Sequence, residues 1–172
     1  MKVPILNDLR AFHDDRGFFV ELWKQDEEDF FQDNFSWSKP NVFRGFHFQN
    51  PYPQGKLITV LSGSVVDIVI DLRKHSETYK KYEVYVLSGT NHKQLFVPQG
   101  FAHGFVAMEE TCFFYKNTNK YCKECEHTLK YNDEDINIRW GEIIDNTENL
   151  IISEKDILGK SLKQLDEENL LF

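Results

Sequence analysis

The chain is built mainly from short segments of apolar, β-branched and aromatic residues that are separated by turn residues. Such segments favour strands, and they cover residues 18–23, 57–61, 65–71, 82–87, 93–97, 101–108 and 111–117. Turn residues punctuate them at 62–64, 88–91 and 98–100. Strands at a spacing of about 8–12 residues, with no long amphipathic helix between them, are typical of an antiparallel sandwich or barrel.

The two ends of the chain add a few elements to this pattern. Residues 1–13 are expected to form an edge strand and a turn, and Asp14 to Gly17 form a turn signal. An acidic stretch over 24–31 predicts a short helix, and a polar-aromatic stretch over 32–38 predicts a loop. Ser153 offers a helix start for a short C-terminal helix over 154–166. Without repeats or linkers, residues 1–172 are predicted to be one all-β domain.

Charge and cysteine content exclude several classes of function. The formal net charge is −8 and no block of Lys or Arg offsets it, which argues against a nucleic-acid partner. No apolar run reaches the roughly 18 residues of a membrane span, and residues 1–4 do not begin a signal peptide. Three cysteines do not make an even disulfide framework, so we expect a cytoplasmic protein with reduced thiols.

Residues 41–49 place polar side chains inside an aromatic run. Alternate residues of a strand face opposite sides, so regular alternation would separate Arg44 from His47. A bulge at Gly45 would bring the two side chains to one face. Alternatively, one of the two would extend across a dimer interface, so that both belong to one pocket. The alternative is a buried strand with a hydrogen-bonded core histidine and an Arg whose head reaches solvent.

Several further polar residues interrupt strands where an apolar side chain would be less costly to bury. They either share one polar cavity or line the solvated face of a sheet, and a shared cavity would be a ligand site. The set comprises Arg16, Glu21, Arg44, His47, Lys56, Asp67, His103 and Tyr115.

A series of short motifs, in order over about residues 5–160, resembles the dTDP-4-dehydrorhamnose 3,5-epimerase family. The motifs are Asp15-Arg16-Gly17-Phe18-Phe19, Gln32-Asp33-Asn34, Phe43-Arg44-Gly45-Phe46-His47-Phe48-Gln49, Gln54-Gly55-Lys56, Pro98-Gln99-Gly100-Phe101-Ala102-His103-Gly104-Phe105, Phe114-Tyr115-Lys116 and Ser153-Glu154-Lys155-Asp156. The resemblance implies a cupin-type jelly roll, a homodimer that exchanges strands across its interface, and no metal or organic cofactor.

The resemblance also implies a reaction and its catalytic residues. The ketone of a nucleotide-linked 4-keto sugar acidifies the hydrogens at C3 and C5, so epimerisation needs a base, an acid and a cation for the enolate. By resemblance His47 is the base, Tyr115 the acid and Asp156 the group that orients the imidazole. Lys56, with Arg44, would stabilise the enolate oxygen.

The substrate ligands are likewise implied by the resemblance. Diphosphate or sugar ligands would be Arg16, Arg44, His103 and Lys155, since Arg suits bidentate phosphate contacts. Phe18 would stack on the base. The nucleoside and sugar would be held by Glu21, Gln32, Asp33, Asn34 and Glu126.

Two departures from the family pattern concern the nucleotide. Lys120 stands where a tyrosine of the family stacks on thymine, so either Tyr121 replaces it or the base differs. Phe35 follows Asn34 where the family usually has a histidine. A third departure concerns the dimer: the N-terminal segment is shorter than is usual in the family, which could alter strand exchange.

Two metal-site interpretations compete with this one. The run from Cys122 to His127 has two cysteines, but a structural zinc site takes four ligands and no second Cys pair exists. A metal cupin would carry a His-x-His pair with a nearby Glu, whereas this chain has His47-Phe48-Gln49 and then Lys56. We therefore expect no metal.

The leading hypothesis is a cofactor-independent epimerase acting at C3, C5 or both of a nucleotide-linked 4-keto-6-deoxy sugar, a hexose or a heptose. A ketoisomerase that moves the carbonyl between C4 and C3 is the second hypothesis, although it would not need Tyr115 as an acid. The third is a non-catalytic module that binds sugar nucleotides.

Overall fold

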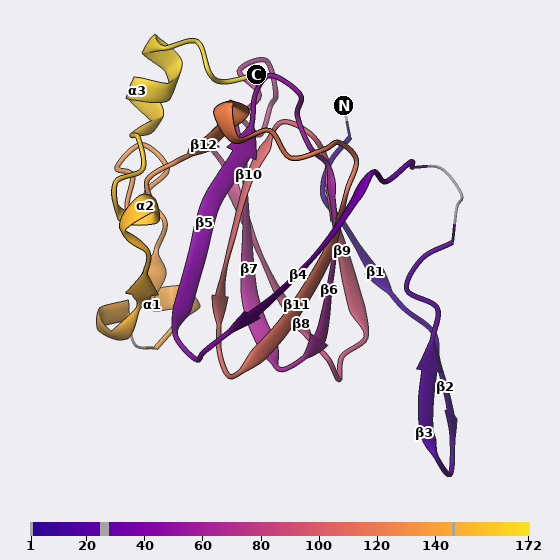
Figure 1. Ribbon diagram of the computed structural model, residues 1–172. Helices are drawn as coiled ribbons and strands as arrows, with labels where there is room; N and C mark the ends of the chain where they lie inside the picture. Colours follow the sequence, from indigo (N-terminus) through magenta and orange to yellow (C-terminus); the bar gives the residue numbers. More distant parts are fainter. Residues whose placement is uncertain (1, 25–27, 146) are drawn as a thin grey trace.

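Two sheets lie face to face and form the body of the computed structural model, which describes residues 2–24, 28–145 and 147–172 (Figure 1). One sheet is antiparallel in the order β1 (Ile5–Asp8), β9 (Lys93–Val97), β6 (Lys56–Ser62), β11 (Thr111–Asn117) and β4 (Gln32–Ser38). The other has the antiparallel order β12 (Glu126–Thr128), β5 (Val42–Gln49), β10 (Phe101–Ala107), β7 (Ser64–Asp71) and β8 (Tyr82–Ser88), and β13 (Ile151–Ile152) pairs with β5 in parallel. The predicted all-β jelly roll is confirmed.

The central strands of the second sheet, β7 and β10, are buried on both faces. On its inner face Val69 and Phe105 pack in one apolar cluster with Phe113 of the first sheet. Its outer face carries Phe43 and Phe46 in a second apolar cluster. The mainly apolar sequence of β7 and β10 accords with this double burial, as expected for strands with no solvated face.

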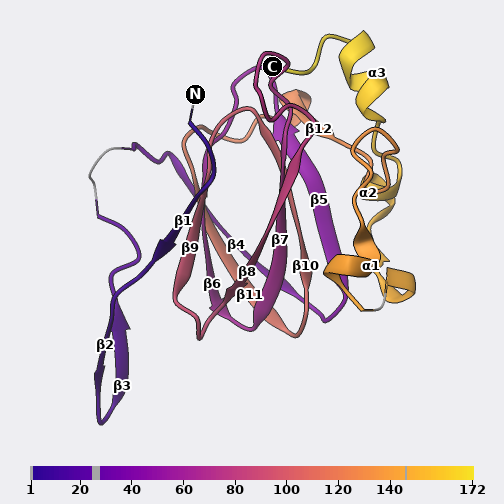
Figure 2. The ribbon, with the colours of Figure 1, turned by 180° about the vertical axis from the view of Figure 1, so that it is seen from behind.

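The C-terminal third of the chain covers that outer face, as Figures 1 and 2 show from opposite sides. Its helical turns are η1 (Lys123–Cys125), α1 (Trp140–Ile143), η2 (Thr147–Asn149), α2 (Glu154–Ile157) and α3 (Leu162–Glu167). Leu162 and Leu165 of α3 bury their side chains in the outer cluster. The predicted start at Ser153 is confirmed, because its hydroxyl accepts a bond from the Asp156 amide.

The predicted single helix over 154–166 is wrong, because the chain forms two short helices there. Lys160 pairs with Leu129 in an isolated β-bridge between α2 and α3, and Gly159 lies against the backbone of Lys130. A new helix then starts at Ser161, which forms a capping box with Gln164.

Three other local predictions need correction. Residues 32–38 form an edge strand instead of a loop, and their polar residues alternate in exposure as a strand requires. The helix expected over 24–31 is absent at residues 24 and 28–31, while residues 25–27 lie outside the described residues. The turn residues at 62–64, between two apolar runs, predict a hairpin, but β6 and β7 belong to different sheets and do not pair with each other.

The N-terminal hairpin stands away from the sandwich. Strands β2 (Ala11–Asp14) and β3 (Gly17–Val20) pair only with each other among the described residues, and they project beyond the end of β1 in both views (Figures 1 and 2). The turn predicted between them is confirmed. Phe18 and Phe19 at this hairpin are 57% and 63% exposed, which is unusual for large apolar side chains grouped together.

Gly45 interrupts the alternation of β5. In the pairing with β10, His47 faces His103 and Arg44 faces Phe105, so β5 carries one extra residue in this interval. Phe43 and Phe46 therefore both point to the outer apolar cluster, and Arg44 and His47 both line the space between the sheets. Of the two ways in which Arg44 and His47 could share a pocket, the structure shows the bulge at Gly45.

The bulge depends on a close approach of two glycines, which gives a stability prediction. A Cβ on Gly45 would lie 2.6 Å from the Cα of Gly104, and its φ of +143° disfavours other residues. We expect Gly45→Ala to lower the free energy of unfolding by about 3 kcal/mol or more.

Gly17→Ala is the matched control, because Gly17 has a similar φ of +135° but no atom within 4 Å of the place that a Cβ would take. Backbone strain alone should cost about 1–2 kcal/mol there. Denaturant unfolding measures both variants. An equal decrease in the free energy of unfolding for Gly45→Ala and Gly17→Ala would contradict the importance of the contact between Gly45 and Gly104.

Candidate active site

A cavity of about 520 Å³ opens between the two sheets beside α2. Its charged and polar walls come from strands of both sheets, since β5, β10 and β12 belong to one sheet and β6 and β11 to the other. Eight of the residues that were predicted from the sequence line it together: Arg44, His47, Lys56, His103, Tyr115, Glu126, Lys155 and Asp156. Five of these belong to the set for which one shared polar cavity was considered, whereas the other members of that set, Arg16, Glu21 and Asp67, do not line it.

His47 is held by a buried carboxylate. Its Nε2 lies 2.7 Å from Oδ1 of Asp156, and Asp156 is only 3% exposed. Burial by itself would raise the pKa of Asp156, but the bond to His47, the charge of the imidazolium and the Gly45 amide outweigh it and lower that pKa. Asp156 thus stays ionised, fixes the ring and leaves the other ring nitrogen to exchange a proton.

A second histidine–carboxylate pair lies deeper in the same wall. Nε2 of His103 is 2.8 Å from Oδ2 of Asp67, and both side chains are buried. The imidazole stacks on Phe113 with ring centroids 6.2 Å apart. Asp67 stood out in the sequence as a charge inside an apolar strand, but no role was assigned to it; its place is beneath His103.

Lys56 enters the cavity from the sheet opposite His47. Burial lowers the pKa of its ammonium to about 8, against the attraction of Glu126 and Asp67, which act in the other direction. A cation in this position is suited to stabilise an oxyanion that forms on a bound molecule.

Tyr115 also comes from the sheet opposite His47. Burial raises the pKa of its hydroxyl, the charge of Glu126 adds to the rise, and Arg44 counteracts it. The phenol therefore remains protonated near neutral pH and is able to donate its proton.

Arg44 is held at the cavity wall by β4. Its Nε donates to Oγ of Ser38 at 3.0 Å, and its Nη2 donates to the Trp37 carbonyl at 3.3 Å. Ser36, on the same strand, also lines the cavity and was missed because residues 32–38 were predicted to be a loop. Alternation of polar and aromatic residues in this segment was the signal that could have identified it.

An ion pair marks the rim of the cavity. Lys155 donates to Oε2 of Glu126, and the hydroxyl of Tyr121 donates to the same oxygen at 3.0 Å. Burial would raise the pKa of Glu126, but the bond from Lys155 and the charge of His47 prevail and lower it. The rim carboxylate is therefore ionised at neutral pH.

The predicted ligands on β4 face different ways. Gln32 accepts a bond from the Tyr121 amide at 2.9 Å and donates to Asn34 on the same face of the strand. Asp33 is on the opposite, exposed face, where it binds Nζ of Lys116 at 2.8 Å. None of these three residues lines the cavity directly in this chain.

Three other predicted ligands are also outside the cavity of their own chain. Arg16 pairs with Asp14 at the tip of the projecting hairpin, and its side chain is 90% exposed. Phe18 contacts His92 with ring centroids 4.8 Å apart. Glu21 lines a separate cavity of about 890 Å³ beside β1.

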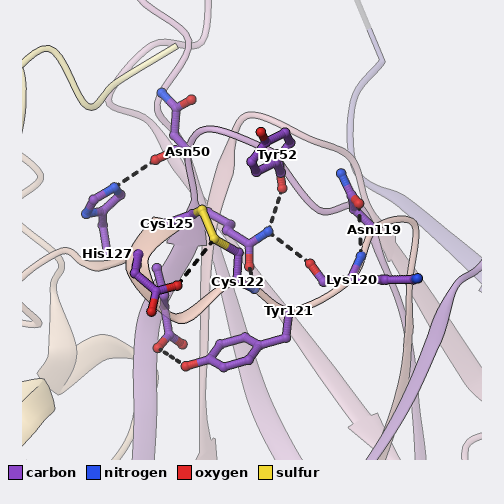
Figure 3. Close-up of a disulfide and its surroundings, with 11 residues drawn as sticks. Asn50, Tyr52, Asn119, Lys120, Tyr121, Cys122, Cys125 and His127 are labelled. Atoms are coloured by element: carbon purple, nitrogen blue, oxygen red, sulfur yellow. Dashed lines mark hydrogen bonds between the residues drawn. A yellow bond between two sulfur atoms is a disulfide. The ribbon is translucent and has the colours of Figure 1, made fainter.

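The loop after β11 contains a disulfide, which corrects the expectation of reduced thiols. Cys122 and Cys125 are bonded, and Cys112 is free (Figure 3). In Figure 3 the Tyr121 ring lies beneath the disulfide, whereas the Lys120 side chain points away from it. Tyr121, and not Lys120, is therefore the residue of this pair that reaches the cavity rim.

The described residues contain no group of three or more His, Cys, Asp or Glu side chains arranged to hold a metal ion. Within the same described ranges, no helix has both the length and the apolar character of a membrane span.

Comparison with known proteins places this geometry in a family. The family model described as dTDP-4-dehydrorhamnose 3,5-epimerase matches residues 3–164. The enzyme of that name from Escherichia coli K12 is 41% identical over 173 residues, which covers 95% of this chain and 90% of that protein.

Solved structures agree with the sequence comparison. The dTDP-6-deoxy-D-glucose-3,5-epimerase of Legionella pneumophila, solved with dTDP-4-keto-L-rhamnose, has a TM-score of 0.89 and 37% identity, covering 98% of this chain and 92% of that one. The dTDP-4-dehydrorhamnose 3,5-epimerase of Bacillus anthracis, solved with TDP and PPi bound, has a TM-score of 0.84 and 38% identity, covering 92% and 93%.

The lowered pKa of Lys56 gives a prediction on stability. An ammonium that is harder to charge in the folded protein destabilises it below pH 8, and the penalty is relieved as pH rises from about 8 towards the unfolded value of about 10.4. We expect Lys56→Met to raise the free energy of unfolding at pH 7 by about 1–3 kcal/mol.

The difference between Lys56→Met and the wild-type protein should shrink as pH rises to 10, because the wild-type lysine is then neutral in the folded state and its site no longer holds a buried charge. Denaturant unfolding at a series of pH values measures it. A difference that is independent of pH would show that the ammonium is not destabilised by its site.

Proposed function

The chain belongs to the dTDP-4-dehydrorhamnose 3,5-epimerase family, and on this premise we propose that it inverts both C3 and C5 of a dTDP-linked 4-keto-6-deoxy sugar. It is an isomerase that acts on the carbohydrate part of a sugar nucleotide. The observation that supports the mechanism best is that His47 and Tyr115 enter one cavity from opposite sheets. Inversion at carbon requires a base on one side and an acid on the other.

The first step is removal of a proton by His47. The imidazole takes the hydrogen from the carbon next to the ketone, and the electron pair of that C–H bond forms an enolate with the C4 oxygen. Asp156 stabilises the resulting imidazolium through its 2.7 Å bond to Nε2. Lys56 donates to the enolate oxygen, where the negative charge develops.

The second step returns a proton from the other face. Tyr115 donates its phenolic proton to the same carbon, the carbonyl re-forms, and the configuration is inverted. Exchange with solvent then restores neutral His47 and protonated Tyr115. The same pair can serve both carbons if the sugar turns in the cavity between two such cycles. Placement of Tyr115 opposite His47 favours epimerisation over movement of the carbonyl, for which no opposing acid is needed.

Substrate affinity is proposed to come from cations around the cavity mouth. Arg44 and Lys155 would bind the diphosphate, with His103 contacting the sugar, in a chain whose formal net charge is −8. The ligands named for the Legionella and Bacillus structures contain dTDP or TDP, which supports thymidine as the base here. Tyr121 is our candidate for the base contact in place of Lys120. Because a nucleotide diphosphate does not cross lipid unaided, we place the reaction in the cytoplasm.

A homodimer is part of the proposal. The hairpin of β2 and β3 carries Arg16 and Phe18 away from its own cavity, with both side chains exposed. Grouped exposed aromatics of this kind mark an interface. We propose that each hairpin reaches the neighbouring chain, so that the partner's Arg16 binds diphosphate there.

Catalysis is tested with His47→Ala and Tyr115→Phe in heavy water. We expect His47→Ala to lose deuterium incorporation at C3 and C5 by about 10²–10⁴-fold, because no base removes the proton. Tyr115→Phe should retain exchange on the His47 face but lose inversion. Mass spectrometry and NMR of the sugar measure both, and calorimetry with dTDP serves as a control for binding. Wild-type exchange in His47→Ala would rule out this base.

The shared site is tested by mixing two inactive variants, His47→Ala and Arg16→Ala. In random two-fold dimers, each mixed dimer keeps one intact site, so about one quarter of wild-type activity should return. Sedimentation should give twice the chain mass of 20.4 kDa. A monomer, or a mixture that stays inactive after subunit exchange, would contradict the shared site.

A further inference from the structure

The Cys122–Cys125 disulfide closes a four-residue loop at the rim of the cavity (Figure 3). Tyr121 directly precedes it and Glu126 directly follows it in the chain. Glu126 then begins β12, which pairs with β5 so that Glu126 lies opposite Gln49 and Thr128 opposite His47. The covalent link therefore lies directly before the strand that borders the catalytic histidine.

The back of this loop is fixed to the end of β5. Gln49 accepts a bond from the Cys122 amide at 2.9 Å and donates to the Lys120 carbonyl at 3.1 Å. The Asn50 amide donates to the Cys125 carbonyl at 2.9 Å. Because the backbone of the loop is anchored at both cysteines, a change at the disulfide would be transmitted to the neighbouring residues Tyr121 and Glu126.

The front of the loop faces the substrate cavity. The Tyr121 hydroxyl bridges the disulfide loop by donating to Oε2 of Glu126 at 3.0 Å, and Lys155 donates to the same oxygen. Glu126 and Lys155 both line the cavity. The disulfide thus sets the distance between two residues whose side chains meet at the rim.

Global stability is a weak explanation for a bond in this position. The chain entropy that a disulfide removes from the unfolded state grows with loop length, and a sequence separation of three is near the short end. A short link has its main effect on local geometry.

We propose that Cys122 and Cys125 are positioning residues: their disulfide holds Tyr121 and Glu126 against Lys155, and its reduction loosens this rim and weakens binding of the sugar nucleotide. The inference rests on the proposed function, since the ligand is that substrate. The catalytic side chains belong to β5, β6, β11 and α2 and lie outside the disulfide loop itself, so turnover of bound substrate is retained.

The redox step is thiol–disulfide exchange with a dithiol as reductant. A thiolate of the dithiol attacks Sγ of Cys122, which is partly exposed, while Cys125 is buried. The Cys122–Cys125 bond breaks, and Cys125 leaves as a thiolate that takes up a proton. The second thiol of the reductant then displaces Cys122 as a thiol and becomes a disulfide itself. Two electrons pass from the dithiol to the protein.

The test compares the oxidised wild-type protein with the same protein reduced by dithiothreitol, using the dTDP-4-keto-6-deoxy sugar and titration with dTDP. We expect reduction to raise KM and the Kd for dTDP by about fivefold while kcat changes by less than about twofold. A double variant, Cys122→Ser with Cys125→Ser, should match the reduced protein and no longer respond to dithiothreitol.

Cys112→Ser is the matched control, because Cys112 is the free cysteine and should leave the redox response intact. If the disulfide acts through the carboxylate of Glu126, reduction of the Glu126→Ala variant should raise KM by less than about twofold. Unchanged KM and Kd on reduction, or an undiminished effect in Glu126→Ala, would overturn the inference. Absence of turnover in oxidised wild-type protein would overturn the proposed function instead, and the dTDP titrations would then decide the role of the disulfide alone.

Discussion

The close approach of Gly45 to Gly104 is the contact on which the active site depends. It lets β5 carry an extra residue against β10, so that Phe43 and Phe46 both join the outer apolar cluster. Arg44 and His47 consequently both face the inner cavity, where regular alternation would have placed them on opposite faces. The Gly45 amide also donates to Asp156, which connects the bulge to the carboxylate that holds His47. The position of Gly45 therefore affects the backbone geometry of β5, the packing of the outer apolar cluster and the orientation of His47.

Environment, more than residue type, sets the proposed roles of the ionisable groups. Burial raises the pKa of Tyr115 and keeps a proton available, whereas burial lowers the pKa of Lys56 to about 8. Asp156 stays ionised because its bonds outweigh its burial. Holding these groups between two sheets costs folding free energy, because burial removes ionisable groups from water.

Sequence patterns predicted the strands of the sandwich well, because β6 to β11 are apolar runs bounded by turn residues. The family resemblance of residues 153–156 implied that Asp156 orients the imidazole, and Asp156 does lie beside His47. Tertiary contacts decided the rest. Polar β4 is a strand because β11 pairs with it along its whole length, and the C-terminal helix breaks where Lys160 bridges to Leu129. The pairing of Cys122 with Cys125 depends on a local loop geometry that cysteine counting did not address. The place of Arg16 outside its own cavity follows from a hairpin whose projection no local pattern encodes.

We propose that one cavity moves protons at both carbons next to the ketone of a dTDP-linked sugar. The most direct test of this proposal is incubation of the wild-type protein in heavy water with 4-keto-6-deoxy sugars linked to dTDP, UDP, GDP or CDP, with label positions determined by NMR. We expect deuterium at both C3 and C5, incorporated fastest into the dTDP sugar, with the ketone still at C4. Label at a single carbon, a ketone moved to C3, or no label on any of the four sugars would contradict it.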